Sequence, residues 1–99
     1  MEERYTESPE LITSVDSEQS QLKLEFTLVL VDKENINLMM NENGCYLFVP
    51  SEDLDYVATV SFLSPVKPAE AKATFQDGFL IVKIPFKEAL QNHVKVPIE

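Results

Sequence analysis

The chain has 99 residues, 44% of them hydrophobic, and its seventeen acidic and eight basic residues give a formal net charge of −9. This length suits one small domain with a single core. The acidic balance argues against nucleic acid and anionic membrane surfaces as partners, because both attract clustered lysine and arginine. A single cysteine, Cys45, excludes an intrachain disulfide and fits a reducing compartment. We therefore expect a cytoplasmic protein.

The N-terminal third predicts a polar arm followed by two strands. Residues 1–10 are polar and acidic, lack the features of a signal peptide, and are expected to form a short mobile arm. Residues 11–15 suit a short edge strand, and residues 16–21 a polar turn. Residues 22–31 place apolar side chains at alternate positions, which predicts a long strand with one buried face (Leu22, Leu24, Phe26, Leu28, Leu30). Because Val29 and Val31 make the other face apolar too, this end is expected to be covered on both sides.

Two glycines, the only ones in the chain, each mark a hairpin. Asn43-Gly44 lies between strands expected at residues 36–40 and 45–49, and Asp77-Gly78 between strands at residues 71–75 and 79–84. Asp and Gly tolerate the positive φ that a type I′ turn requires. Residues 56–62 alternate as a further strand. An acidic loop at 51–55 precedes it, and a loop with two prolines at 64–70 follows it.

These elements predict an all-β domain. Seven or eight short strands with regular turn signals and no helical periodicity favour a two-sheet antiparallel, immunoglobulin-like β-sandwich over residues 11–86. A brief helical turn is expected at residues 86–91, where the sandwich ends. Residues 87–99 form a C-terminal extension that ends in a tail at 93–99.

No catalytic or metal-binding motif is found. Cys45 lies in an expected strand and is interpreted as a core residue, while His93 lies in the polar tail and is interpreted as a solvated side chain. Glu52, Asp53 and Asp55 lack the glycine turn and the richer ligand pattern of a calcium loop. We therefore expect no enzymatic activity, no metal and no cofactor.

The second hairpin resembles a known family. Ala-x-Ala-x-Phe-x-Asp-Gly-Phe-Leu from Ala71, followed by an apolar strand that ends at Pro85, is similar to the signature near the end of the α-crystallin domain of small heat shock proteins. Residues 30–38 resemble the family's connection into its fourth strand. The resemblance covers residues 11–99. It implies the α-crystallin (Hsp20-like) sandwich and an ATP-independent chaperone.

Val96-Pro97-Ile98 resembles the C-terminal Ile-x-Ile/Val motif of the same family. Pro97 fixes φ and removes a donor, so the segment is pre-ordered, and Val96 and Ile98 point the same way. The resemblance implies that this docking tail, with Val94, enters a groove that in the family lies between the fourth and eighth strands of another subunit. The residues that would line the groove come from two strands (Ile36, Leu38, Met40, Ala71, Ala73, Phe75). Alternatively, the tail packs on its own domain or pairs as a final edge strand.

Three departures from the family pattern bear on assembly. The N-terminal arm is short and polar, the loop at 51–55 is too short to hold the extra strand that some members swap between subunits, and Ala58 or Thr59 stands where an arginine is often found. Self-association is still expected, as a dimer or a larger homo-oligomer, but its size and interface do not follow from the sequence.

Three functions remain open. The first is a holdase that binds partly unfolded clients and prevents their aggregation, as the Val96-Pro97-Ile98 motif favours. The second is a monomeric adaptor similar to the CS domain of co-chaperones, which binds one folded partner. The third is a subordinate domain in a larger assembly.

Overall fold

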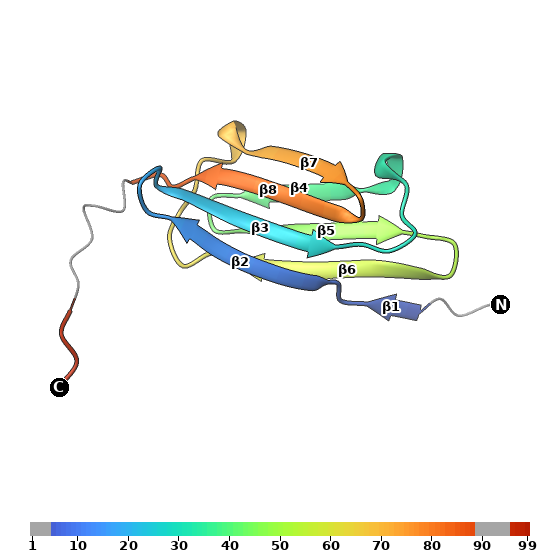
Figure 1. Ribbon diagram of the computed structural model, residues 1–99, viewed down its shortest axis with the longest axis horizontal. Coiled ribbons are helices and arrows are strands. Elements are labelled where there is room, and N and C mark those ends of the chain that lie inside the picture. Colours follow the sequence, from blue (N-terminus) through green and yellow to red (C-terminus); the bar gives the residue numbers. More distant parts are fainter. Residues whose placement is uncertain (1–4, 89–95) are drawn as a thin grey trace.

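The computed structural model describes residues 5–88 and 96–99, and within them eight β-strands form two four-stranded sheets (Figure 1). The first sheet has the order β1 (Tyr5–Glu7), β6 (Leu54–Ser61), β5 (Gly44–Pro50), β4 (Asn37–Asn41). The second has the order β2 (Glu10–Asp16), β3 (Gln21–Thr27), β8 (Phe79–Pro85), β7 (Lys72–Gln76). Two 3₁₀ turns, η1 (Lys33–Asn35) and η2 (Pro68–Glu70), lie in the connections. The predicted all-β sandwich is therefore confirmed.

The core lies between the two sheets and comes mainly from their central strands. In β3, buried residues alternate with partly exposed ones, as the period-two pattern predicted. The fully or nearly buried side chains come from β3, β5, β6, β8 and the adjoining segments (Leu22, Leu24, Phe26, Leu28, Cys45, Leu47, Val49, Tyr56, Val66, Leu80, Val82, Ile84, Phe86). Burial of Cys45 confirms its interpretation as a core residue.

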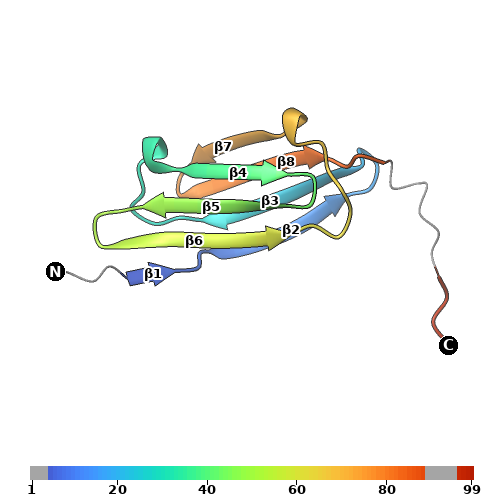
Figure 2. The ribbon, with the colours of Figure 1, turned by 180° about the vertical axis from the view of Figure 1, so that it is seen from behind.

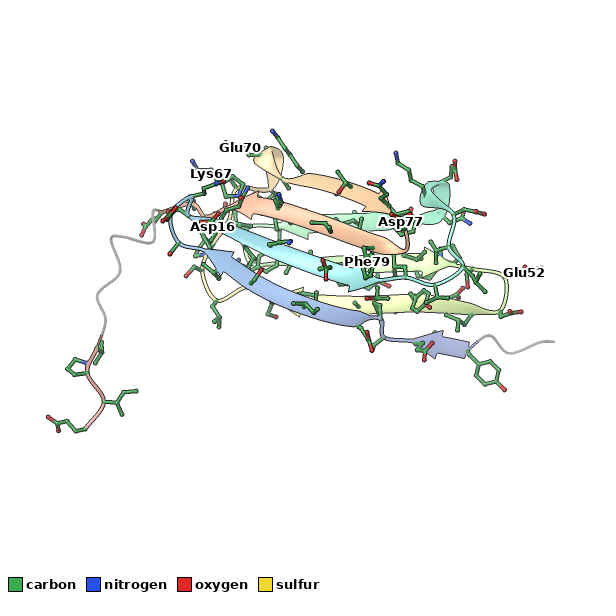
Figure 3. All side chains as sticks on the ribbon, viewed as in Figure 1. Asp16, Glu52, Lys67, Glu70, Asp77 and Phe79 are labelled. Carbon is green, nitrogen blue, oxygen red and sulfur yellow. The ribbon has the colours of Figure 1, made fainter. Side chains whose placement is uncertain are left out.

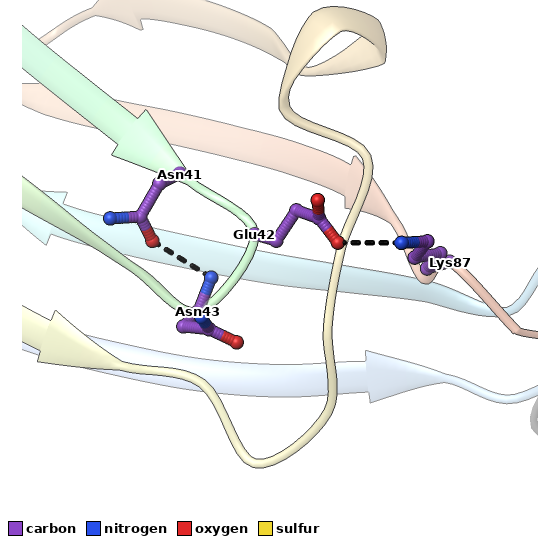
Figure 4. A network of polar contacts seen from close by, with 4 residues as sticks. All are labelled: Asn41, Glu42, Asn43 and Lys87. Carbon is purple, nitrogen blue, oxygen red and sulfur yellow. Dashed lines mark hydrogen bonds and ion pairs between the residues drawn. The ribbon is translucent and has the colours of Figure 1, made fainter.

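Both predicted hairpins are present, but their glycines act differently. Gln76 pairs with Phe79, and both Asp77 (φ 53°) and Gly78 (φ 85°) have the positive φ values of the predicted turn. In the first hairpin Asn41 pairs with Gly44, so the two turn residues are Glu42 and Asn43. The Asn41 side-chain oxygen accepts hydrogen bonds from the Asn43 and Gly44 amides at 2.8 and 3.0 Å, the first of which Figure 4 shows. A Cβ on Gly44 would overlap the carbonyl oxygen of Val60, so glycine is needed here for close approach.

The expected long strand at 22–31 ends earlier than predicted. β3 stops at Thr27, and Leu30 has a left-handed backbone with φ 55°. Val29 is 58% and Leu30 is 90% exposed, so the prediction that this end is covered on both sides was wrong. A left-handed turn breaks the alternation of faces and rotates these side chains into solvent.

The N-terminal segment also differs from the expected arm. Tyr5–Glu7 forms β1, which pairs in parallel with residues 54–56 of β6, so the sandwich is not wholly antiparallel. At the other end, Phe86 forms a β-bridge with Val66 rather than a helical turn, and residues 89–91 of that expected turn lie outside the described residues.

β4, β7 and β2 are outer strands of their sheets, whereas β6 lies between β1 and β5. β7 faces β4 along one side of the sandwich, and β2 faces β6 along the other (Figures 1 and 2). Each of these two sides has a hollow that opens between the sheets. The hollow beside β4 and β7 is where the sequence predicted a docking groove.

Candidate functional site

The β4–β7 groove is a hollow of about 340 Å³ between the two sheets. Four of the six residues predicted to form it line it, two near β4 and two on β7 (Ile36, Leu38, Ala73, Phe75). Its remaining lining residues are Lys33 of η1, Thr74 of β7 and Leu80 of β8. The topology thus brings together apolar side chains that lie more than thirty positions apart in the chain.

Strand register explains why these side chains face the groove. Leu38 pairs with buried Leu47, while Ala73 pairs with buried Val82, so both point inward. Because β4 and β7 are outer strands, Leu38 remains half-buried and Ala73 is exposed. The small side chain of Ala73 leaves space that an apolar side chain of another segment can fill.

Two predicted groove residues lie elsewhere. Met40 and Ala71 pack against the core, but neither lines this hollow. Met40 instead lines a separate hollow of about 450 Å³ beside the β4–β5 turn. Conversely, the sequence prediction missed Leu80, although the two-residue Asp-Gly turn places it opposite Phe75 and provides a signal for it. No pattern in the sequence points to Lys33.

The start of the C-terminal extension is fixed to the sandwich by backbone and side-chain contacts. The amide of Phe86 donates to the Ser20 carbonyl, and the amide of Lys87 to the Pro65 carbonyl, each at 2.8 Å. The Lys87 ammonium lies 2.9 Å from the Glu42 carboxylate (Figure 4), a contact that raises the pKa of Lys87. The extension therefore leaves the domain beside the β4–β5 turn, at one end of β4.

The docking tail is exposed where it is described. Val96 is 74% and Ile98 is 98% exposed, whereas Val94 and His93 lie outside the described residues. Both apolar side chains are thus available to another surface. That they enter the β4–β7 groove stays a prediction.

The connection between β5 and β6 is shorter than expected. β5 ends at Pro50 and β6 begins at Leu54, which leaves three residues between them; Glu52 marks this loop in Figure 3. Ser51 closes the loop, since its amide donates to the Leu54 carbonyl at 2.9 Å. Three residues cannot form a strand that reaches another subunit.

The described residues offer little for catalysis or metal binding. Burial raises the pKa of the Cys45 thiol to about 11, which keeps it protonated and a poor nucleophile at neutral pH. Across residues 5–88 and 96–99, no three His, Cys, Asp or Glu side chains are grouped so that they could hold a metal ion. In the same ranges, none of the helical segments is both long and apolar enough to cross a bilayer.

Solved structures with the same architecture come from heat shock proteins. Heat shock protein 16.0 of Schizosaccharomyces pombe has a TM-score of 0.74 at 14% identity, over 95% of this chain and 77% of that one. HSP18.5 of E. histolytica has a TM-score of 0.73 at 18% identity, over 92% and 98% of the two chains. A deletion mutant of Hsp14.1 from Sulfolobus solfataricus P2 has a TM-score of 0.71 at 14% identity, over 84% and 79%. The chain has the small heat shock protein fold.

This fold confirms the structural resemblance read from the second hairpin. No protein-family model and no curated protein matches the sequence, so the likeness to small heat shock proteins is one of structure. The sequence assigned docking to residues of the β4–β7 groove and to Val96 and Ile98, and this docking stays a prediction.

Proposed function

We propose that the protein is a non-enzymatic, ATP-independent holdase of the cytoplasm that binds partly unfolded proteins and prevents their aggregation. The observation that carries the proposal is the apolar β4–β7 groove on a small heat shock protein fold, in a chain that also exposes Val96 and Ile98. Partly unfolded clients expose apolar surface, which such grooves and unpaired strand edges can bind. The net charge of −9 supports solubility of the resulting complexes.

In this proposal the tail of one subunit docks in the β4–β7 groove of another. Burial of two aliphatic side chains contributes roughly 3–6 kcal/mol, whereas association costs about 4–15 kcal/mol. A single tail therefore binds weakly. Several tails in one assembly bind well, because each docking event raises the effective concentration for the next.

Holdase activity is tested with a client that aggregates on heating. Light scattering by the client should fall as the protein is added, and unchanged scattering at several-fold excess would reject the proposal. The double variant Val96→Ser, Ile98→Ser should be assayed in parallel, to show whether protection of the client depends on assembly.

Tail docking is tested by the mass of the assembly. The double variant Val96→Ser, Ile98→Ser should give a smaller species by native mass measurement. The matched control is Val29→Ser, Leu30→Ser, which removes two apolar side chains of comparable exposure outside the tail. It should leave the mass unchanged. Equal masses for all three chains would contradict docking between subunits.

The groove itself can be filled. Ala73→Leu places a larger side chain in the hollow at an exposed position, so the domain should still fold, and the assembly should become smaller. Gln76→Leu, on the outer face of the same strand, is the control and should have no effect.

The adaptor function is the second candidate, and the three-residue connection between β5 and β6 favours it. A chain without a swapped strand can remain monomeric. A monomeric mass together with one folded partner recovered at equal stoichiometry would support the adaptor over the holdase.

A further inference from the structure

A further hollow lies at the end of the sandwich where the chain leaves β3. This Leu30 hollow has a volume of about 470 Å³ and lies between the segment that follows β3 and the connection from β5 to β6. Figure 1 shows both segments at the end of the sandwich that carries η1, and Figure 3 labels Glu52 in the second of them. The hollow shares no lining residue with the β4–β7 groove, so it is separate from the surface to which we assign tail docking.

Leu30 combines a strained backbone with an exposed apolar side chain. Its φ of 55° lies in the left-handed region, which leucine rarely adopts, and its side chain is 90% exposed. Burial of the side chain within this chain therefore does not offset the backbone strain. Strained residues persist where the surrounding structure holds them, and they cluster at ligand-binding sites. A leucine held in this way is suited to contact a partner.

Hydrogen bonds to both sheets hold the segment around Leu30 in place. The Leu28 amide donates to the Gly78 carbonyl at 2.8 Å, at the turn that precedes β8 of the second sheet. The Val29 amide donates at 3.3 Å to the hydroxyl of Tyr56, a buried residue of β6 in the first sheet. Because this wall of the hollow is fixed before a ligand arrives, docking costs less conformational entropy.

The lining of the hollow is apolar with an acidic rim. Its apolar side chains come from the segment after β3 and from the start of β6 (Val29, Leu30, Val31, Leu54). Three exposed acidic residues complete the rim: Asp32, Glu52 and Asp53. None of the ten lining residues is basic, and Lys33, the neighbour of Asp32, lines the β4–β7 groove instead.

The charge of the rim defines the ligand that complements it. Between the described residues, ion pairs form at Glu42 and Glu70 and not at the three acidic residues of the hollow. The net charge of −9 adds to the negative potential. Lysine and arginine side chains are attracted to such a rim, and acidic side chains are repelled. A cation alone would leave the apolar lining in water, so the complementary ligand carries an apolar side chain as well.

We propose that the Leu30 hollow docks an extended segment of a partner protein in which one large apolar side chain has a lysine or arginine two residues away on each side. Side chains two positions apart in an extended segment share a face, so the apolar side chain contacts Leu30 while the cations reach Asp32 on one wall and Glu52 on the other. This inference goes beyond the proposed function, since it holds for a monomeric adaptor as well as for a holdase. One short segment binds weakly, with a dissociation constant on the order of millimolar.

Methyl and amide NMR of the full chain provides the direct test. The peptide acetyl-Lys-Ser-Leu-Ser-Lys-amide should shift the signals of Val29, Leu30, Val31 and Leu54 in a saturable way. Two control peptides should bind at least tenfold more weakly: one with both lysines replaced by glutamate, and one with the leucine replaced by serine. Equal binding of either control, or shifts confined to other parts of the domain, would overturn the proposal.

Two leucine variants test the apolar contact. Leu30→Gly removes the side chain and suits the positive φ, so the domain should still fold while binding of the peptide falls at least tenfold. Leu63→Gly is the matched control, because Leu63 is a fully exposed leucine that does not line the hollow. It should leave binding within twofold. Unchanged binding by Leu30→Gly would contradict the assignment.

Two double variants test the rim. Glu52→Gln with Asp53→Asn should weaken binding of the peptide by about threefold to tenfold, because each removes one exposed ionic contact. Glu10→Gln with Glu18→Gln changes the net charge of the chain equally at exposed positions outside the hollow, and should leave binding within twofold. Equal losses in the two chains would show that overall charge alone attracts the peptide, which rejects a built site.

The same titration separates this proposal from tail docking. The chain with Val96→Ser and Ile98→Ser should bind the peptide unchanged, whereas the chain with Val29→Ser and Leu30→Ser should lose the peptide and keep its assembly mass. Binding should weaken several-fold between about 0.01 M and about 0.15 M ionic strength, because salt screens the attraction between lysine and carboxylate. Shifts of the same signals with protein concentration, without peptide, would place a second copy in the hollow and overturn the proposal.

Discussion

At the scale of single residues, the fold leaves no room for a side chain at Gly44. Gly44→Ala should destabilise the domain by about 1–3 kcal/mol, because the added Cβ meets the carbonyl oxygen of Val60 on the neighbouring strand. Chemical denaturation measures the change. Ser61→Ala, at the exposed position that pairs with Gly44, should stay within about 0.5 kcal/mol. An unchanged midpoint for Gly44→Ala would show that β5 and β6 do not approach this closely.

Cys45 provides a residue-scale prediction on pH. The folded domain raises the thiol pKa from 9.0 to about 11, because burial disfavours the thiolate. Between pH 9 and 11 the unfolded chain therefore loses this proton while the folded chain keeps it, so stability should fall as pH rises. Denaturation across this range should show a steeper decline for the parent chain than for Cys45→Ala. Parallel declines would contradict the predicted shift.

The limits of sequence reasoning are also visible at single residues. The alternation of Leu22, Leu24 and Phe26 predicted their burial correctly, because successive side chains of a strand point to opposite faces of the sheet. The left-handed backbone of Leu30 has no signal in its residue type, since leucine rarely adopts it. The same positive φ was predicted at Gly78 because glycine permits it.

At the scale of elements, we expect β1 to contribute little to stability. Its three residues are all exposed, and it pairs only with the start of β6, from Leu54 to Tyr56. Removal of residues 1–7 should therefore change the stability by no more than about 1 kcal/mol. Hydrogen exchange should accelerate at residues 54–56 and remain slow in β3 and β8. Thr6→Pro, which removes one backbone donor, should have the same local effect.

Loss of protection throughout β3 and β8 after this truncation would show instead that β1 is part of the cooperative core. That outcome would also change the interpretation of the N-terminal segment, from an added edge strand to an integral part of the sandwich.

The separation along the sequence between paired strands explains which elements the sequence could predict. The β7–β8 hairpin follows from two adjacent strands and the Asp77-Gly78 turn, all within fifteen residues. β1 shows no periodicity over three residues, and its partner lies almost fifty positions away. The β4–β7 groove was predicted only through the resemblance to small heat shock proteins, because it depends on how the two sheets stack.

At the scale of the whole molecule, charge opposes the association that we propose for the groove and the tail. Each chain carries a formal charge of −9, so two copies repel one another at long range. Of the described contacts that could offset this repulsion, the β4–β7 groove and the exposed Val96 and Ile98 are apolar. Salt screens the repulsion between charges but does not weaken apolar burial.

Association should therefore strengthen with salt. Between about 0.01 M and about 0.15 M ionic strength the screening length falls from roughly 30 Å to roughly 8 Å, which removes most of the repulsion between neighbouring chains. Light scattering should show the mean mass rising over this range. The variant Val96→Ser, Ile98→Ser should keep a low mass throughout, because screening creates no contact that the variant lacks. A mass that falls with salt would show that ion pairs, rather than apolar side chains, hold the subunits together.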